Sequence, residues 1–430
     1  MKISAAGDAI IQRRIPENYG GYEEIAKFIS ESDASFFNLE TTLNYEGECY
    51  ASQYSGGTYV RVVPEVIPEL MRYGFNMTSF NNNHAMDFSY EGLLSTLDVL
   101  DSSGLVHAGV GRNLAEASCP RYLETKEGRV ALIAVNTSFN PAMMAGNQTD
   151  IVPGRPGING MRVNKHVCVT DEEFEFIKSL GERTGINVER TIIAKEGYYA
   201  LPEDNEANLG ELKFVRSEKS EYVMKIDPRD IERVKRAIHE AKLQADYIIV
   251  SVHSHQLAGD KKENPADFLV DFCHECIDIG ANAIIGHGPH LLRPIEIYKN
   301  APIFYSLGDF ILELYSVSYA PADFFEKHGL DPRVGVHELL KARSKNFTVG
   351  LMEDERMMMS VIPLWEVDKN GSLLSLKLMP IELAMRDNKS QCGLPRRAPA
   401  EKIAKYLSDM SAAYGTKFRI DEDANIVCSW

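Results

Sequence analysis

The sequence has little of what marks secreted, membrane-spanning or disulfide-bonded proteins. Its seven cysteines are odd in number and scattered, which is typical of reduced thiols in a cytoplasm. No apolar run is long enough to cross a bilayer, and the first run is interrupted at Gly7 and Asp8. We therefore predict neither a membrane anchor nor a signal peptide, and we expect a cytoplasmic protein.

Positive charge is also scarce. The chain has 46 Lys and Arg against 62 Asp and Glu, a formal net charge of −16. A field of this sign repels nucleic acids and anionic membranes, so we predict no nucleic-acid partner. An anionic substrate would need arginines or metal ions placed locally.

What the sequence does contain is a regular alternation of short apolar strands and amphipathic helices up to about residue 311. This alternation is typical of the α/β class. Strands are predicted at residues 2–8, 34–40, 75–82, 105–111, 129–138, 246–254 and 282–288. Helices are predicted at residues 22–30, 64–74, 89–104, 228–244 and 265–280. Cys273 and Cys276, the one Cys-x-x-Cys pair, lie on the apolar face of the last helix, which favours core packing over metal binding.

The pattern changes in two places. Residues from about 153 to 228 break the alternation and are predicted to form an insertion over the site of a core that spans residues 1–330. Residues 331–430 are predicted to add helices and strands that pack on this core. They include a meander over residues 347–383 and an amphipathic helix at residues 399–416.

Ligand-type side chains recur where the predicted strands end. They are Asp8, Asn38 with Glu40, Asn83 with His84, His253, and His287 with His290. In open α/β sheets, the carboxyl ends of the strands meet at one edge, where sites form. Taken singly, each residue has a structural explanation, such as a helix cap or a turn. Recurrence at five strand ends favours a site instead, and these residue types suit Zn, Mn or Fe.

The order of these motifs resembles that of the CapA family, which is associated with poly-γ-glutamate capsule synthesis. The motifs are Gly7–Asp8, Asn38–Glu40, Asn82–Asp87 and residues 104–113, 153–159, 250–253 and 284–310. The CapA family is itself similar to the calcineurin-like metallophosphatases. The resemblance covers about residues 2–311 and implies a four-layer α/β/β/α sandwich around a site for two metal ions.

The resemblance also implies roles for individual residues. Six would bind one or two divalent ions (Mn, Zn or Fe): Asp8, Glu40, Asn83, His253, His287 and His290. Glu40 stands where a bridging carboxylate belongs. His84 matches the histidine that protonates the leaving group, and Asp87 would orient it.

The chain departs from the metallophosphatase pattern around these ligands. No histidine follows Asp8 at the second position, and His287 and His290 are spaced His-x-x-His. These departures predict two unequally held metals or a single one. His255 follows His253 by two residues, so it is either a further ligand or a catalytic residue that faces the substrate.

Three arginines are predicted to bind an anionic substrate. They are Arg61, Arg155 and Arg293: the resemblance implies that Arg61 and Arg155 lie in loops facing the site, and Arg293 follows the motif of His287 and His290. A guanidinium beside a metal cluster would give this acidic chain a local site for a carboxylate or a phosphate.

We predict a metal-dependent hydrolase that uses metal-activated water on a phosphoester or on a γ-glutamyl or peptide amide. Its substrate would be an anionic small molecule, a peptide or polyglutamate. Two alternatives stay open. The same site could epimerise a peptide at Cα with His84 or His255 as the base, or the protein could bind polyglutamate without catalysis.

Overall fold

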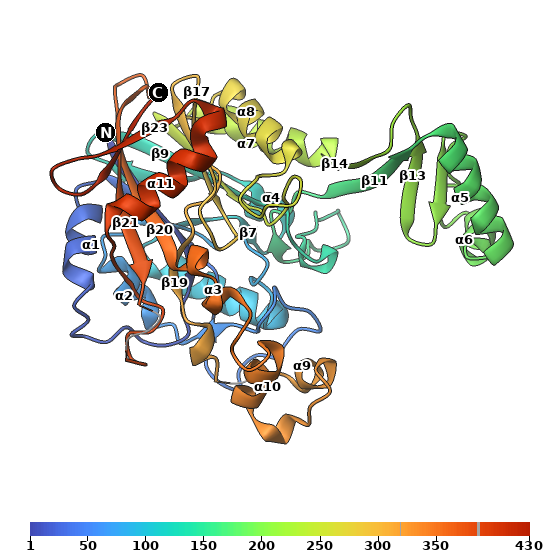
Figure 1. The fold of residues 1–430 in the computed structure, drawn as a ribbon, viewed down its shortest axis with the longest axis horizontal. Coiled ribbons are helices and arrows are strands. Elements are labelled where there is room, and N and C mark those ends of the chain that lie inside the picture. The colour runs from blue at the N-terminus through green and yellow to red at the C-terminus, as the bar shows by residue number, and fades with distance from the viewer. Residues whose placement is uncertain (319, 385–387) are drawn as a thin grey trace. The chain divides into compact units, whose positions relative to one another are not determined.

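The computed structural model describes residues 1–318, 320–384 and 388–430 (Figure 1). These residues divide into two compact units. The first, called the core unit here, comprises Met1–Gly160 and Glu232–Trp430, and the second, the small unit, comprises Met161–Ile231. Within the described ranges, every helix is too short or too polar to span a bilayer.

The core unit contains a large mixed sheet with β1 (Lys2–Ile10) at its centre. Every residue of β1 after Lys2 is buried, as expected of a strand covered on both faces. The main path of this sheet, in spatial order, is β23 (Lys417–Ile420), β24 (Ile426–Ser429), β21 (Leu373–Leu383), β20 (Met359–Val367), β1, β2 (Ala34–Leu39), β5 (Met77–Ser79) and β6 (Val106–Ala108). In addition, β19 (Asp309–Leu312) pairs in parallel with β1, and β22 (Pro395–Arg397) pairs with β21.

A second sheet of the core unit packs face to face with the first. Its strands, in spatial order, are β17 (Ile295–Tyr298), β18 (Ala301–Phe304), β16 (Ala283–His287), β15 (Tyr247–His253), β9 (Gly128–Asn136) and β8 (Arg121–Thr125). Ile3 and Phe36 of the first sheet share one buried cluster with Leu132 and Ile249 of the second. This cluster is the centre of the fold.

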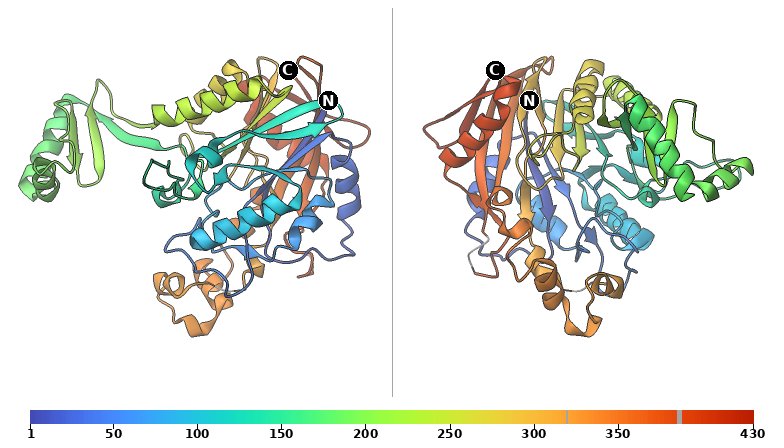
Figure 2. Two further views of the ribbon diagram at one scale, coloured as in Figure 1. Left: turned by 180° about the vertical axis from the view of Figure 1, so that it is seen from behind. Right: turned by 45° about the vertical axis from the view of Figure 1, so that its right-hand side comes forward.

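Helices form the two outer layers. The first sheet is covered by α1 (Tyr22–Ile29), α2 (Val66–Met71) and α3 (Ser89–Ser103), whose apolar residues share a cluster with those of β2. Figure 2 shows α7 (Pro228–Lys242) and α8 (Asp267–Ile279) side by side along the second sheet. The predicted α/β/β/α sandwich is therefore confirmed.

Two further sequence predictions can be compared with the elements of the core unit. Cys273 and Cys276 are buried free thiols on α8, which confirms core packing. The C-terminal hairpin begins at Met359 and not at residue 347 as predicted, because residues 351–353 and 355–358 form 3₁₀ turns. Its strands β20 and β21 extend the sheet that contains β1.

Short helices and strands complete the core unit. They are β3 (Thr42–Leu43), β4 (Arg61–Val62), β7 (Val110–Gly111), α4 (Leu114–Ser118), β10 (Gly157–Ile158), α9 (Ala322–Lys327), α10 (Val336–Arg343) and α11 (Ala400–Ser411). The predicted C-terminal amphipathic helix is α11, which contributes Ile403 and Leu407 to the central cluster.

The small unit has its own four-stranded sheet. Its strands, in spatial order, are β12 (Glu206–Leu209), β13 (Leu212–Arg216), β11 (Val163–Val169) and β14 (Glu221–Ile226), and its helices are α5 (Asp171–Thr184) and α6 (Val188–Lys195). A capping box of Thr170 and Glu173 begins α5, and Gly185 ends it in a left-handed conformation. The predicted insertion overlaps this unit in sequence. Its placement over the site, and the predicted boundary at residue 330, stay predictions.

Candidate metal centre

The carboxyl ends of parallel strands from both sheets bring polar side chains to one edge of the core unit. Asp8 lies near the end of β1, opposite Asn38 of β2. His253 and His287 end β15 and β16 and are paired in register. The turn after β5 adds Asn83 and His84, which no strand register fixes.

The first group of ligand-type atoms consists of Asp8, His253 and His287, all fully buried. The Nδ1 atoms of the two histidines are 2.9 Å apart, and Asp8 Oδ1 lies 3.5 Å from His287 Nδ1 and 3.9 Å from His253 Nδ1. Asp8 is held by hydrogen bonds from Asn38 Nδ2 (2.7 Å) and the Gly288 amide (2.8 Å). One carboxylate oxygen and two ring nitrogens thus face a common point.

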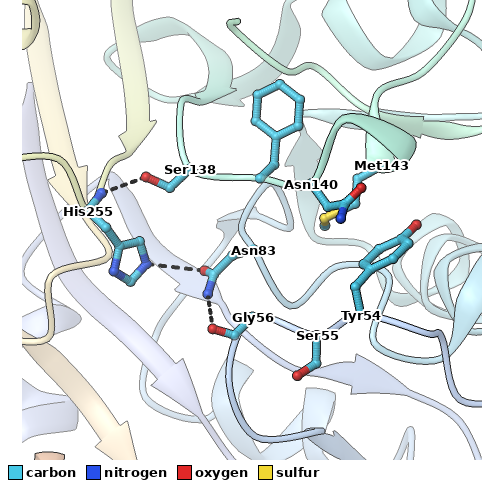
Figure 3. Close-up of a pocket in the computed structure, with 9 residues that line it drawn as sticks. Tyr54, Ser55, Gly56, Asn83, Ser138, Asn140, Met143 and His255 are labelled. Carbon is cyan, nitrogen blue, oxygen red and sulfur yellow. Dashed lines mark hydrogen bonds between the residues drawn. The ribbon is translucent and has the colours of Figure 1, made fainter. Parts of the chain in front are cut away.

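The second group uses the opposite nitrogen of His253 together with Glu40 and His255. His253 Nε2 lies 2.6 Å from Asn83 Oδ1, 3.1 Å from His255 Nε2 and 3.6 Å from Glu40 Oε1. His255 Nε2 lies 3.3 Å from Asn83 Oδ1, as Figure 3 shows. A neutral imidazole offers one lone pair, so the two groups compete for His253.

A third group joins His290 to Asp8 and to Asp309, a residue that the sequence reasoning missed. His290 Nδ1 lies 2.9 Å from Asp309 Oδ1 and 3.9 Å from Asp8 Oδ2. The signal was present, because Gly308–Asp309 repeats the Gly7–Asp8 pair. Asp8 and Asp309 are partners in the β1–β19 register, and a Cβ on Gly7 would lie 1.7 Å from the Gly308 carbonyl oxygen. The two glycines allow the two aspartates to come together.

Burial dominates the electrostatics of these groups. Burial, together with Asp309, raises the pKa of Asp8 to about 6, and burial and the neighbouring aspartates raise the pKa of Glu40. Burial also lowers the pKa of His287 to about 3 and, together with neighbouring imidazoles, depresses that of His253. The imidazoles of His253 and His287 are therefore neutral and available as ligands.

Glu40 provides the test of whether a cation fits. It is fully buried, and within the described part of the chain neither carboxylate oxygen has a hydrogen-bond partner. A buried carboxyl group without a partner is destabilising unless a cation or a proton compensates it. The surrounding atoms are neutral imidazole nitrogens and an amide oxygen, which suit Zn, Mn or Fe. The residues fit a divalent ion.

His84 and Asp87 lie within hydrogen-bond distance of each other, and the orienting role of Asp87 stays a prediction. Its Nδ1 lies 2.7 Å from Asp87 Oδ2, and its Nε2 lies 4.0 Å from Glu40 Oε1. Asp87 also accepts hydrogen bonds from the backbone amides of Gly56 (3.1 Å) and Val60 (2.9 Å). The Gly56 loop lies so close that a Cβ there would be 2.6 Å from His84 Nε2.

A pocket of about 270 Å³ adjoins the second group (Figure 3). It is lined by Tyr54, Ser55, Gly56, Asn83, Ser138, Phe139, Asn140, Met143 and His255. Its lining is aromatic, amide and hydroxyl in character, and among the described residues no Asp, Glu, Lys or Arg contributes to it. It therefore suits a neutral part of a ligand, and Asn83 and His255 connect it to the buried atoms.

The structure places the three predicted arginines in different surroundings. Arg61 donates to the Asn44 carbonyl (3.2 Å), and the exposed Arg155 donates to the Met144 carbonyl through Nε (3.2 Å). Arg293 is fully buried and donates to backbone carbonyls of the loop that carries His255. Their predicted role in substrate binding stays a prediction.

Comparisons with known proteins agree with the motif resemblance. Residues 2–313 match the family model described as bacterial capsule synthesis protein PGA_cap. The chain is similar to the uncharacterized protein y4sH of Sinorhizobium fredii, with 32% identity over 439 residues that cover 98% of this chain and 92% of that protein. It is also similar to the capsule biosynthesis protein CapA of Bacillus anthracis, with 19% identity over 73% of this chain and 60% of the relative.

Among solved structures, the chain is similar to a 5′-nucleotidase precursor from Thermus thermophilus. The identity is 9% and the TM-score 0.36, with 88% of this chain and 54% of that chain covered. A likeness this remote says nothing about activity.

Proposed function

The chain belongs to the family of bacterial capsule synthesis proteins described as PGA_cap, and on this premise we propose that it is a metal-dependent hydrolase. Its proposed substrate is an anionic phosphoester, or a γ-glutamyl or peptide amide related to poly-γ-glutamate. The observation that carries the proposal is Glu40, whose two buried oxygens lie beside three imidazoles and have no hydrogen-bond partner among the described residues.

The proposed metal ligands are Asp8, Glu40, Asn83, His253, His287 and His290. Asp309 would orient His290 through its 2.9 Å contact with Nδ1. A divalent ion held by this set would supply Lewis acidity and lower the pKa of a water molecule. Because His253 belongs to two of the groups, we expect one ion to be held more tightly than a second.

The proposed proton donor to the leaving group is His84. Asp87 lies within hydrogen-bond distance of its Nδ1, and its Nε2 lies 4.0 Å from Glu40 Oε1. A positioned imidazole contributes about 10²- to 10⁴-fold to such reactions. His255 Nε2 lies among ligand atoms, 3.1 Å from His253 Nε2, which favours a ligand role over that of a base. A neutral part of the substrate would occupy the pocket beside Asn83.

Metal content measured by mass spectrometry tests the ligand set. Native protein loaded with Mn or Zn is compared with Glu40→Ala and His287→Ala, and His274→Ala serves as the control because it lies on α8 and bonds to Glu296. We expect the first two variants to lose metal and the control to keep it. Full metal content in either site variant contradicts the ligand assignment.

Activity is then measured on a chromogenic phosphodiester and on poly-γ-glutamate. We expect turnover with Mn or Zn and its loss in His84→Ala. Binding of polyglutamate without turnover, unchanged in His84→Ala, would instead support a binding subunit. Deuterium incorporation at Cα of a peptide without bond cleavage would support epimerisation.

A further inference from the structure

The buried side chain of Arg293 fixes the loop that follows β15. Its guanidinium donates to the carbonyl oxygens of Lys262 (3.0 Å), Gln256 (2.9 Å) and Ser254 (3.3 Å). Burying a guanidinium against backbone carbonyls is destabilising, and burial lowers its pKa to about 10. Its hydrogen bonds offset this cost and fix the loop at residues 254, 256 and 262.

The same loop is closed on itself near Lys262. Leu257 and Pro265 form an antiparallel bridge, and the Asn264 amide donates to the Lys261 carbonyl at 3.1 Å. Residues 254–265 are thus held at both ends and at the Lys262 backbone. Because the backbone of this loop is already ordered, it loses little conformational entropy when a ligand binds.

Lys262 is the half-buried cation that this loop presents. Within the described part of the chain, its ammonium group has no hydrogen-bond or ion-pair partner. The guanidinium of Arg293 donates to the Lys262 carbonyl (3.0 Å) and also to the His255 carbonyl (3.5 Å), so the backbone of Lys262 lies beside that of the candidate ligand His255. The positive charge of Lys262 accordingly contributes to lowering the pKa of His255. Asp309 is the carboxylate that influences it most, but the nearer partner of Asp309 is His290.

Charges packed around Lys262 from other elements are already paired. Arg356 binds Asp354 and, at 2.8 Å, Glu263. Among the described groups around Lys262, these pairs leave its ammonium group available to bind an anion. In a chain of net charge −16, a cation of this kind creates a local positive potential that favours binding of an anionic group.

We propose that Lys262 binds the anionic group of the substrate, a phosphate or a carboxylate, and that Arg293 is the positioning residue that fixes it. This inference rests on the proposed function, because the bound anion would lie beside the metal ligands. It also gives Arg293 a role that differs from direct substrate binding. Lys262 acts as a point charge, so both anions are accepted, and the neutral pocket takes another part of the molecule.

The test is anion binding measured by calorimetry on metal-loaded protein, with inorganic phosphate and γ-glutamylglutamate as separate probes. Lys262→Met is compared with Lys261→Met, which removes an exposed charge one residue earlier, and with Lys262→Arg. We expect Lys262→Met to weaken binding of at least one probe about tenfold, which is the size of a lost charge-assisted contact. Lys261→Met should bind as native protein does, and Lys262→Arg should retain most of the affinity. The probe whose binding is weakened by Lys262→Met shows whether Lys262 binds a phosphate or a carboxylate.

Native affinity for both probes in Lys262→Met, with native metal content, overturns the inference and leaves the proposed function standing. An equal loss in Lys261→Met also overturns it, because the effect is then one of net charge. Failure of native protein to bind metal contradicts the proposed function separately. Lys262-dependent anion binding by metal-free protein would still support the role of Lys262.

The positioning role of Arg293 is tested by a double-mutant cycle with Arg293→Lys. If Arg293 acts through Lys262, Arg293→Lys weakens anion binding in the native background but adds no further loss in Lys262→Met. Equal losses in both backgrounds contradict the positioning role, because a purely structural effect does not depend on Lys262.

Discussion

The candidate metal centre and the small unit differ in where their charged side chains lie and whether these have partners. At the centre, Asp8 and Glu40 are fully buried, and Glu40 lacks a partner within the described chain. In the small unit, Arg216 pairs at the surface with Asp171 and Glu175. The small unit instead exposes apolar side chains, with Phe176 on α5 59% exposed.

This difference shows where folding alone explains the sequence and where it does not. Surface ion pairs add little stability and need no further explanation. Buried carboxyl groups without partners destabilise the metal-free fold, so a ligand that compensates them is expected. Four experiments test this difference between the two regions.

The largest effect is expected from removing Glu40. At a metal concentration of 1,000 times the Kd, bound metal adds about 4 kcal/mol to the free energy of unfolding. We expect native protein to show this gain with Mn or Zn in denaturant titrations and Glu40→Gln to lose most of it. Glu175→Gln, which breaks a surface pair of the small unit, is the control and should gain as native protein does. An undiminished gain in Glu40→Gln contradicts the role of Glu40.

The pH dependence of stability should reverse when metal binds. The pKa of Asp8, about 6 when folded, exceeds the value of about 3.9 in an unfolded chain. Metal-free protein binds more protons when folded, so this stabilisation is complete below about pH 4 and is lost as pH rises through 6.

The two pKa values correspond to about 3 kcal/mol, which should appear as a difference between native protein and Asp8→Asn in unfolding measured from pH 4 to 7. With metal the sign changes, because protons compete for the ligands and the stabilisation by metal falls below about pH 6. Parallel pH profiles of the two proteins would rule out a raised pKa at Asp8.

A smaller effect is expected from Asp87→Asn. The variant loses the carboxylate that orients His84, and turnover of a chromogenic phosphodiester should fall about 10- to 100-fold. Metal content should stay native. The matched control is Asp101→Asn, which alters another His–Asp pair, between His107 and Asp101 at 3.0 Å, and should leave turnover unchanged. Equal rates for native protein and Asp87→Asn contradict the role of His84.

The smallest effect is expected in the small unit. Phe176→Ser replaces an exposed ring and should change the free energy of unfolding by less than about 0.5 kcal/mol in denaturant titrations. Phe174→Ser, two residues earlier and fully buried, is the matched control and should destabilise this unit far more. A large loss from Phe176→Ser would show that its ring is covered in solution.

Much of the core unit could be predicted because its strands are long apolar runs with ligand-type residues directly after them. Parallel register places His253 beside His287, and the packing of the two sheets then brings Asp8 to them. Asp309 could not be placed in the same way. It begins a short strand, β19, that returns to β1 from far along the chain.

Other features depend on contacts that sequence patterns do not encode. The guanidinium of Arg293 lies at the end of a long side chain, so its position after a motif does not fix what it touches. The sheet of the small unit was not predicted, because buried and exposed residues do not alternate along β11. Lys262 was missed because only the folded loop brings it beside His255.

The carboxylate of Asp87 has a consequence for how substrate and proton transfer are linked. It accepts hydrogen bonds from His84 and also from the amides of Gly56 and Val60, which flank the loop along the pocket. We therefore expect a molecule that pushes this loop outward to tilt the imidazole of His84 as well. Occupancy of the pocket and the orientation of the proposed proton donor would then be linked through the side chain of Asp87.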